Sequence, residues 1–361
     1  MELGVILGDV HTTLSPREHL DGLLRQVEAA QRNGVRYIVM GHHYLYGNLR
    51  WLQPIPTLAR IAAELDPGVR IGTMVVQVPL FHPVALAEEL ATLDILARGQ
   101  LVVGAGAGYR REEFTAFGVD FDRRFAMMDE ALQIVRMLWT QDEVTFHGRF
   151  WTLDGVRTHI RPWQDPYPPI WIGALRDSGV RRSARLGDAW PVTPETRTSD
   201  MRRMFDVYAQ ARRKHGRPLV ARHPLRREIV PGRTTEAAFA RFESMARDRL
   251  LAYAQRELMT RDADALRDQF RKVAEKEAIV GTPGECLAQL RDLAAQVPVD
   301  PVIVRAQWPD MSSDEVVAYL DDLGRDIVPG LNEITAIDAH SLESRPDGRF
   351  PTRQERCDVP R

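Results

Sequence analysis

The feature that most constrains this chain is the alternation of short apolar, often β-branched runs with longer amphipathic stretches. This alternation is typical of βα units, and strands that are apolar throughout are expected in a parallel sheet covered by helices on both faces. The sequence predicts eight strands: Leu3–Leu7, Tyr37–Met40, Ile71–Val76, Leu101–Gly106, Ile170–Gly173, Ala189–Val192, Arg227–Val230 and Val302–Trp308. Eight strands, each followed by a helix, predict an α/β fold, a (β/α)8 TIM barrel. A doubly wound open sheet is the alternative, and the count of eight disfavours it.

Helix boundaries are marked by capping residues. A serine or threonine before proline is typical of a helix start, and a glycine is typical of a helix end. These signals predict helices from Ser15-Pro16 to Asn33-Gly34, His82-Pro83 to Arg98-Gly99, Asp122 to about Trp139, Asp177-Ser178 to Leu186-Gly187, and from Thr282-Pro283 onward.

Two segments interrupt the alternation. Residues 140–169 contain a predicted hairpin and a proline-rich stretch, and residues 233–281 are a long, charged, helix-forming insertion. We expect both insertions at the C-terminal face of the barrel, where they would shape the pocket. The predicted organisation is therefore one barrel over residues 1–330 and a C-terminal tail over residues 331–361, which has little periodicity.

Composition excludes several classes of protein. The 48 basic and 50 acidic side chains give a net charge of -2, which offers no attraction for nucleic acid. No apolar run approaches the about 18 residues of a membrane span, and the N-terminal residues lack the apolar core of a secretory signal. The distant Cys286 and Cys357 argue against a disulfide framework. We therefore expect a cytoplasmic enzyme without membrane contact.

His11 and His42 lack the further ligands of a zinc site, so no metal is predicted.

Polar residues follow the predicted second and fourth strands at their carboxyl ends, which together form the mouth of a barrel. His42 and His43 come directly after the second strand, where a histidine can act as acid, base or hydrogen-bond donor. A loop histidine bonded to nearby backbone is the alternative.

Glycines alternate over 104–108, but Tyr109 replaces the third glycine of a dinucleotide fingerprint. We interpret this as a strand end that a flat ligand approaches closely, with Tyr109, Arg110 and Glu113 around it. A plain glycine-rich turn is equally open.

A second candidate site follows the fifth strand. The helix predicted near Asp177 presents backbone N–H groups at its N-terminus, and Arg176 and Ser178 add donors, which together suit a phosphate. An ordinary capped connection is the alternative. Trp190 and Trp308 stand at predicted strand ends, where a tryptophan either stacks on a planar ligand or simply packs.

The ordered series of motifs resembles one family. The series is Ile71–Thr73, His82-Pro83, Gly99-Gln100, Gly104–Gly106, Glu113-Phe114, Phe117-Gly118, Pro168–Gly173 and Gly187–Trp190. It is similar to the bacterial luciferase-like superfamily of flavin- and deazaflavin-dependent oxidoreductases, from Leu3 to about Pro329. The resemblance implies a (β/α)8 barrel, commonly a homodimer, that holds the isoalloxazine ring of its cofactor at the mouth.

The resemblance also assigns roles to residues. It implies that His42 is the catalytic histidine, and that Met74-Val75 form a non-prolyl cis peptide behind the ring. Further cofactor contacts are implied for Gly106, Gly108, Tyr109, Gly173, Ala174, Ser178 and Gly179, and we expect His43, Trp190 and Trp308 in the substrate pocket. Two positions depart from the family pattern: Gly41 replaces an acidic residue before the histidine, and Ala107 lies close to the place where deazaflavin dehydrogenases often have glutamate.

Three functions remain open. The leading hypothesis is a flavin-dependent monooxygenase that takes reduced FMN from a separate reductase and uses O2 to oxygenate a small organic substrate. The second is an oxidoreductase that transfers hydride with the deazaflavin coenzyme F-420. The third is a flavin-binding barrel without turnover, for which the missing acid at Gly41 is the motivation.

Overall fold

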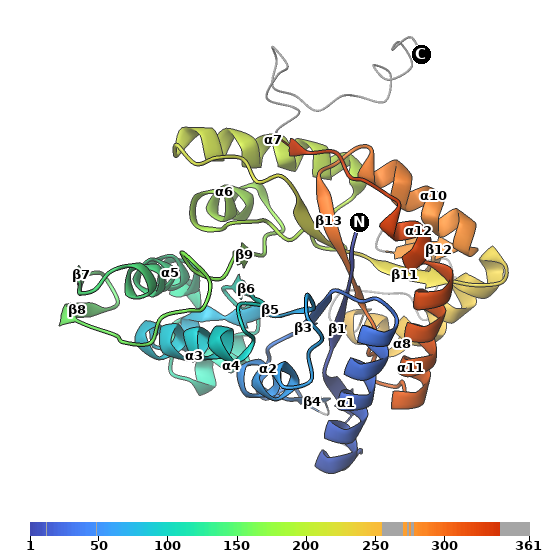
Figure 1. Ribbon diagram of the computed structural model, residues 1–361, viewed down its shortest axis with the longest axis horizontal. Coiled ribbons are helices and arrows are strands. Elements are labelled where there is room, and N and C mark those ends of the chain that lie inside the picture. Colours follow the sequence, from blue (N-terminus) through green and yellow to red (C-terminus); the bar gives the residue numbers. More distant parts are fainter. Residues whose placement is uncertain (12, 48, 255–269, 273, 276–277, 340–361) are drawn as a thin grey trace, which may run out of the picture.

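Seven parallel strands follow one another around a barrel, and the helices surround them in chain order (Figure 1). The computed structural model describes residues 1–11, 13–47, 49–254, 270–272, 274–275 and 278–339. The strands pair in the order β10-β13-β1-β3-β5-β6-β9. Their bounds are β1 (Leu3–Leu7), β3 (Tyr37–Met40), β5 (Arg70–Gln77), β6 (Leu101–Gly106), β9 (Ile170–Ile172), β10 (His223–Arg226) and β13 (Val299–Arg305).

The segment 189–192 joins the two edge strands of this sheet. Ala189 forms a parallel bridge with Trp171 of β9, and Val192 forms one with Leu225 of β10. The predicted sixth strand therefore exists as two isolated bridges that complete the ring. The (β/α)8 barrel predicted from the sequence is confirmed.

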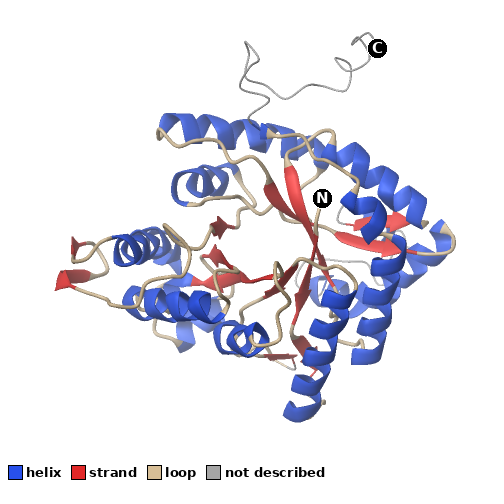
Figure 2. Ribbon diagram, viewed as in Figure 1, coloured by secondary structure: helices blue, strands red, loops and turns tan. Residues whose placement is uncertain are grey.

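Helices cover the outside of the ring (Figure 2), and the helices predicted from capping residues begin within two residues of the expected positions. Ser15 and Thr282 each form a reciprocal capping box at the start of a helix. All five predicted helices are present, as α1 (Pro16–Arg32), α3 (Pro83–Leu96), α5 (Arg124–Thr140), α6 (Asp177–Leu186) and α10 (Pro283–Ala294). The further helices among the described residues are α2 (Pro54–Ala62), α4 (Arg111–Ala116), α7 (Thr198–Lys214), α8 (Thr235–Ala254), α11 (Ser313–Asp326) and α12 (Val328–Asn332), with short 3-10 turns at Val78–Leu80 and Phe121–Arg123.

The prediction of a barrel strand at Arg227–Val230 is wrong. The barrel strand is β10, which ends at Arg226, and β11 (Glu228–Pro231) leaves the ring to pair with β12 (Ala278–Gly281). Pro224 lies inside β10, and because proline lacks an N–H it disguises a strand in the sequence. Here the Pro224 carbonyl still accepts a bond from the Val192 amide, at 2.8 Å.

The prediction that residues 140–169 cover the C-terminal face is also wrong. They form the expected hairpin, β7 (Val144–His147) with β8 (Thr152–Val156), but the segment connects a helix to the following strand. Such connections lie where strands begin. Accordingly, the Gln164 side chain donates to the carbonyl of Leu101, the first residue of β6, at 2.8 Å. The insertion 233–281 follows the carboxyl end of β10 as predicted, although residues 255–269, 273 and 276–277 lie outside the described residues.

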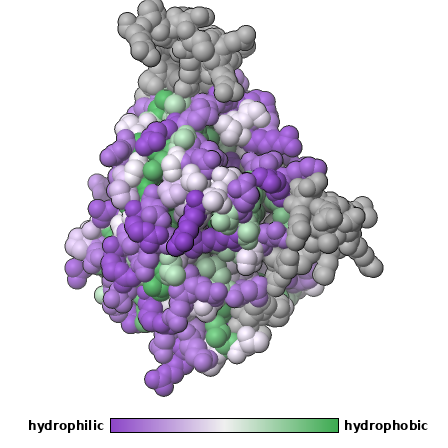
Figure 3. Space-filling model, turned by 90° about the vertical axis from the view of Figure 1, so that its right-hand side faces the viewer, coloured by the Kyte–Doolittle hydropathy of each residue, from purple (hydrophilic) through white to green (hydrophobic). Residues whose placement is uncertain are grey.

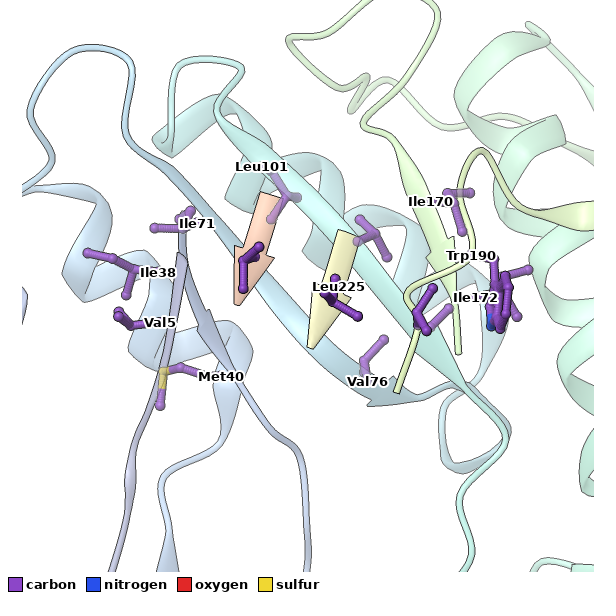
Figure 4. Close-up of a cluster of buried hydrophobic side chains, with 14 of the residues drawn as sticks. Val5, Ile38, Met40, Ile71, Val76, Leu101, Ile170, Ile172, Trp190 and Leu225 are labelled. Atoms are coloured by element: carbon purple, nitrogen blue, oxygen red, sulfur yellow. The ribbon is translucent and has the colours of Figure 1, made fainter. Parts of the chain in front are cut away.

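Alternate residues of each strand face two different cores. The larger core lies between strands and helices, and Figure 4 shows part of it, with Val5, Ile38 and Leu225 among its labelled residues. The smaller core has the opposite parity, so it fills the inside of the ring: Ile6, Tyr37, Val39, Val102, Trp171, Ala189 and Ile303. The rings of Tyr37 and Trp171 lie 5.8 Å apart there. This packed interior fills the barrel below the residues at its mouth.

Polar side chains predominate on the face over α10 and α11, and apolar groups are scattered among them (Figure 3). Within the part of the chain that the structure describes, no helix combines the length and apolarity of a membrane span. Residues 331–339, which were assigned to the tail, still pack on the barrel: Leu331 and Ile334 are buried, and the Ile337 amide bonds to Ala294. Residues 340–361 lie outside the described residues.

Candidate functional site

The predicted site residues lie at the carboxyl ends of four neighbouring strands. In the order β3, β5, β6 and β9, these strand ends carry His42, the Met74-Val75 bond, Gly106 and Gly173. Carboxyl ends of parallel strands meet at one edge, which in a barrel is the mouth. The structure therefore brings these predicted residues together.

A bulge in β5 carries the second pair of predicted residues. The Met74-Val75 peptide bond is cis, as the resemblance implies, and the pairing register of β5 and β6 shifts between Thr73 and Val76. A Cβ on Gly106 would lie 2.4 Å from Val75 Cγ2, and one on Gly173 would lie 3.7 Å from Val75 Cγ1. The Val75 side chain therefore fits between two glycines and forms a small apolar wall at the mouth.

His42 is buried and held by one neighbour, Gln77. The Gln77 backbone amide donates to His42 Nδ1 at 3.0 Å, and the Gln77 side-chain amide donates to the His42 carbonyl, also at 3.0 Å. The imidazole packs edge-on against Tyr44 at 4.6 Å. Since Nδ1 accepts a hydrogen bond, the proton of the neutral ring sits on Nε2. This atom has no hydrogen bond of full geometry among the described residues, although the Gln53 side chain is near enough to favour the protonated ring. Gln77 was not predicted; its position two residues after the bulge was the available signal.

Burial keeps His42 neutral. Desolvation, reinforced by the adjacent His43, lowers the pKa of His42 from 6.5 to about 4, against the opposing influence of Gln53 and Glu113. At neutral pH the ring is therefore an uncharged imidazole that offers one N–H donor.

The same effect predicts that acid destabilises the protein. His42 and the fully buried His223, whose pKa burial lowers to about 3, bind protons more weakly in the folded than in the unfolded state. Stability contributed by each neutral ring is complete above pH 6.5 and decreases as pH falls toward the folded pKa. From pH 7 to pH 5, each histidine is expected to lower the free energy of unfolding by about 2 kcal/mol.

Urea unfolding of the wild type and of His223→Asn at both pH values tests this prediction. Asparagine keeps an acceptor for the Trp190 amide, which donates to His223 Nδ1 at 3.0 Å, but it does not titrate. The variant should lose less stability than the wild type between the two pH values. Equal losses would contradict the buried neutral state of His223.

His43 lies beside His42 but belongs to a different set of contacts. Its Nδ1 lies 3.0 Å from the buried carboxylate of Glu113 on α4, and its ring packs edge-on against Trp51 at 4.8 Å. A Cβ on Gly41 would lie 2.6 Å from the Trp51 ring. The indole thus occupies the space of an acidic side chain at position 41, and the carboxylate of this site comes from Glu113.

The predicted phosphate loop is an uncapped helix start. No side chain caps the N-terminus of α6, Ser178 is exposed in its first turn, and Asp177 is paired with Arg203 at 2.7 Å. A Cβ on Gly179 would lie 2.9 Å from Ala174 Cβ, so the loop folds closely onto the helix. Free N–H groups at this turn suit an anion.

Both predicted pocket tryptophans are buried. Trp190 is fully buried, stacks edge-on against Phe205 at 5.1 Å, and donates from Nε1 to the Ala174 carbonyl at 3.1 Å. Trp308 lies three residues beyond β13 and packs with Phe242 of α8. Of the two alternatives that the sequence left open, the structure shows packing, and neither indole offers an exposed stacking surface. Through its bond to the Ala174 carbonyl, Trp190 instead supports the loop between β9 and α6.

A cavity of about 390 Å³ lies away from these strand ends, between the start of α7, strand β12 and helix α10. Its charged lining mixes Arg197, Arg227 and Lys272 with Glu275 and Asp292, and it contains none of the predicted site residues. The described residues contain no cluster of three or more His, Cys, Asp or Glu side chains arranged to hold a metal ion.

Comparison with known proteins places the chain in a family. The family model described as luciferase-like monooxygenase matches residues 1–300. The chain belongs to the luciferase-like monooxygenase family, whose members are flavin- or F-420-dependent monooxygenases and oxidoreductases.

Curated relatives match over part of their length. The uncharacterized protein y4vJ of Sinorhizobium fredii is 35% identical over 147 residues, which is 40% of this chain and 41% of that protein. A phthiodiolone/phenolphthiodiolone dimycocerosates ketoreductase of Mycobacterium tuberculosis is 28% identical over 196 residues, 54% of this chain and 51% of that enzyme. The chain thus spans about half the length of the curated relatives it matches.

Solved structures share the fold at low identity. Monooxygenase RslO1 from Streptomyces bottropensis has a TM-score of 0.74 at 24% identity, covering 92% of this chain and 100% of that one. The oxygenating constituent of 3,6-diketocamphane monooxygenase from Pseudomonas putida, in complex with FMN, has a TM-score of 0.72 at 17% identity, covering 91% and 98%. An F-420-dependent secondary alcohol dehydrogenase has a TM-score of 0.71 at 16% identity, with the same coverage.

Proposed function

We propose that this protein is a flavin-dependent monooxygenase that uses reduced FMN and O2 to oxygenate a small organic substrate. The observation that carries the proposal is the convergence at one barrel mouth of three features: a buried N–H donor at His42 without a hydrogen bond of full geometry among the described residues, the Val75–Gly106–Gly173 contact and the uncapped start of α6. The donor suits a reacting oxygen, the Val75 contact suits a planar ring, and the start of α6 suits a terminal phosphate.

The residues present fit such a cofactor. The buried Nε2 of His42 has no hydrogen bond of full geometry within the described residues, so a ligand oxygen would satisfy it. Val75, which fits between Gly106 and Gly173, would support one face of the ring, and Ser178 with the α6 amides would hold the phosphate. The bound cofactor would supply the electrons that activate O2.

His42 would act as a fixed hydrogen-bond donor. The neutral imidazole can donate its Nε2–H to negative charge that develops on an oxygen. It stays neutral near pH 7 because the pKa of His42 is about 4. Its position is set by the two bonds from Gln77, so the donor is oriented before the substrate arrives. This narrows the acid-or-base role expected from the sequence.

Hydride transfer with coenzyme F-420 is the second candidate. The curated ketoreductase relative favours it, as does the hydrogen-bonded pair of His43 and Glu113 at the mouth, which suits proton transfer to a carbonyl oxygen. A ketone or secondary alcohol would then be the substrate.

Parallel fluorescence titrations of the purified protein with FMN, reduced FMN and F-420 separate these candidates. We expect saturable binding of reduced FMN and O2 uptake coupled to product on a panel of small ketones and phenols. Saturable F-420 binding with hydride transfer to cyclohexanone would select the second candidate. Binding of neither cofactor would reject both, and flavin binding without any turnover would select the non-catalytic barrel.

We propose in addition that a separate reductase supplies the reduced FMN and that the protein is a homodimer. Adding an unrelated NADH:FMN oxidoreductase should restore turnover that NADH and FMN alone do not support. Light scattering of the purified chain should give twice the 41.0 kDa mass of one chain.

A further inference from the structure

Three side chains at the mouth form a continuous line of hydrogen bonds from the core to the surface. Glu113 is fully buried, the His43 side chain is 12% exposed, and Tyr109 is 55% exposed. His43 Nδ1 lies 3.0 Å from Glu113 Oε1, and His43 Nε2 lies 3.2 Å from the Tyr109 hydroxyl. The line joins the loop after β3 to the loop after β6 through the short helix α4.

The Glu113 carboxylate fixes the proton position on His43. Burial alone would raise the pKa of Glu113, but the hydrogen bonds from His43, the Tyr44 backbone amide and Gln77 outweigh it and lower the pKa. The ionised carboxylate only accepts, and it receives bonds from the Tyr44 amide at 2.8 Å and from Arg110 at 3.4 Å. The His43 proton therefore sits on Nδ1, and Nε2 carries the lone pair that accepts the Tyr109 O–H.

Packing prevents the His43 ring from turning over. The centres of the Trp51 and Tyr46 rings each lie 4.8 Å from the centre of the His43 ring. The Arg110 guanidinium in turn lies over the Tyr46 ring, 4.3 Å from its centre. The two adjacent histidines thus have opposite tautomers. His42 presents an N–H donor at Nε2, whereas His43 presents a lone pair at Nε2.

We propose that Tyr109 takes the proton of a substrate hydroxyl group, phenolic or carbinol, while its own phenolic proton passes to His43 Nε2. The substrate O–H bond breaks and a Tyr109 O–H bond forms; the original Tyr109 O–H bond breaks and an Nε2–H bond forms. The substrate becomes an oxyanion, and the positive charge on His43 is balanced by the Glu113 carboxylate. No electron changes hands in this step. Glu113 and His43 are positioning residues that act through Tyr109.

This inference names the substrate class of the proposed function and so rests on it. An oxyanion is the form in which a phenol is most electron-rich for oxygenation and in which a carbinol releases hydride, so the relay serves both candidate reactions. The tests below use protein without cofactor, so their failure is distinguishable from failure of the cofactor titrations.

The first test is a nitrogen-15 spectrum of histidine-labelled protein, with His42 and His43 assigned by the loss of signals in His42→Asn and His43→Asn. We expect His42 with a protonated Nε2 and His43 with a protonated Nδ1. Finding His43 protonated at Nε2 overturns the relay, because that nitrogen would then be unable to accept from Tyr109.

The second test uses 4-nitrophenol, whose phenolate is yellow, at pH 6.5, where the free compound is mostly in the phenol form. In the wild type we expect the bound fraction to contain about threefold more phenolate than the free compound. The increase should vanish in Tyr109→Phe and in Glu113→Gln, and it should persist in Tyr46→Phe, whose ring also packs on His43. No binding, or no increase in phenolate in the wild type, overturns the proposal, as does an increase that survives Tyr109→Phe.

Discussion

Replacing His42 with alanine is expected to lower turnover by about 10²- to 10³-fold while cofactor affinity changes little. The expected loss is that of one oriented donor in a site shielded from water. His42 is 3% exposed, its Nδ1 is occupied by the Gln77 amide, and its Nε2 has no hydrogen bond of full geometry among the described residues. Steady-state rates and a fluorescence titration of the same preparation measure turnover and affinity separately.

Two controls distinguish a donor from a structural residue. His42→Gln keeps an N–H donor and similar volume, so it should recover part of the turnover that alanine loses. Because the pKa of His42 is about 4, the wild-type rate should show no titration of this group between pH 5.5 and 8. Equal losses in both variants, or full turnover in His42→Ala, would refute the donor role.

The positions of the strand-end residues could be predicted because local sequence signals determine them. Ser15-Pro16 and Thr282-Pro283 begin helices wherever the fold places them, since a capping box is satisfied within four residues. Gly106 and Gly173 follow apolar runs that have no alternative to a buried strand. The mouth was therefore found from the order of such signals along the chain.

The partners of those residues could not be predicted, because their contacts are distant in sequence. Glu113 reaches His43 across 70 residues, and Trp51 fills the space beside Gly41 only after β4 (Leu49–Trp51) pairs with β2 (Asp9–His11). The position of Trp190 is also decided by contacts that are distant in sequence. Its position at a predicted strand end allows either an exposed or a packed indole, and packing against Phe205 and the hydrogen bond to Ala174 place it in the core.

Gly106→Ala is expected to weaken cofactor binding by about tenfold to a hundredfold, a loss of about 1–3 kcal/mol. The added methyl group would lie 2.4 Å from Val75 Cγ2, which can move away only by a χ1 rotation of this stiff β-branched side chain or by a shift of the backbone. Relief of this overlap shifts Val75, the residue that we propose supports the ring. Dissociation constants from the fluorescence titration measure the effect, and the same clash should lower the melting temperature.

The double variant Val75→Ala/Gly106→Ala isolates the cause. Removing Cγ2 from Val75 leaves room for the new methyl group, so the double variant should bind the cofactor more tightly than Gly106→Ala alone, a coupling that a double-mutant cycle quantifies. Gly284→Ala is the matched control, since a Cβ there has nothing within 4 Å and the residue lies in the first turn of α10. If the two mouth substitutions prove additive, Val75 does not transmit the effect of Gly106, and the apolar wall between the glycines is not part of the cofactor site.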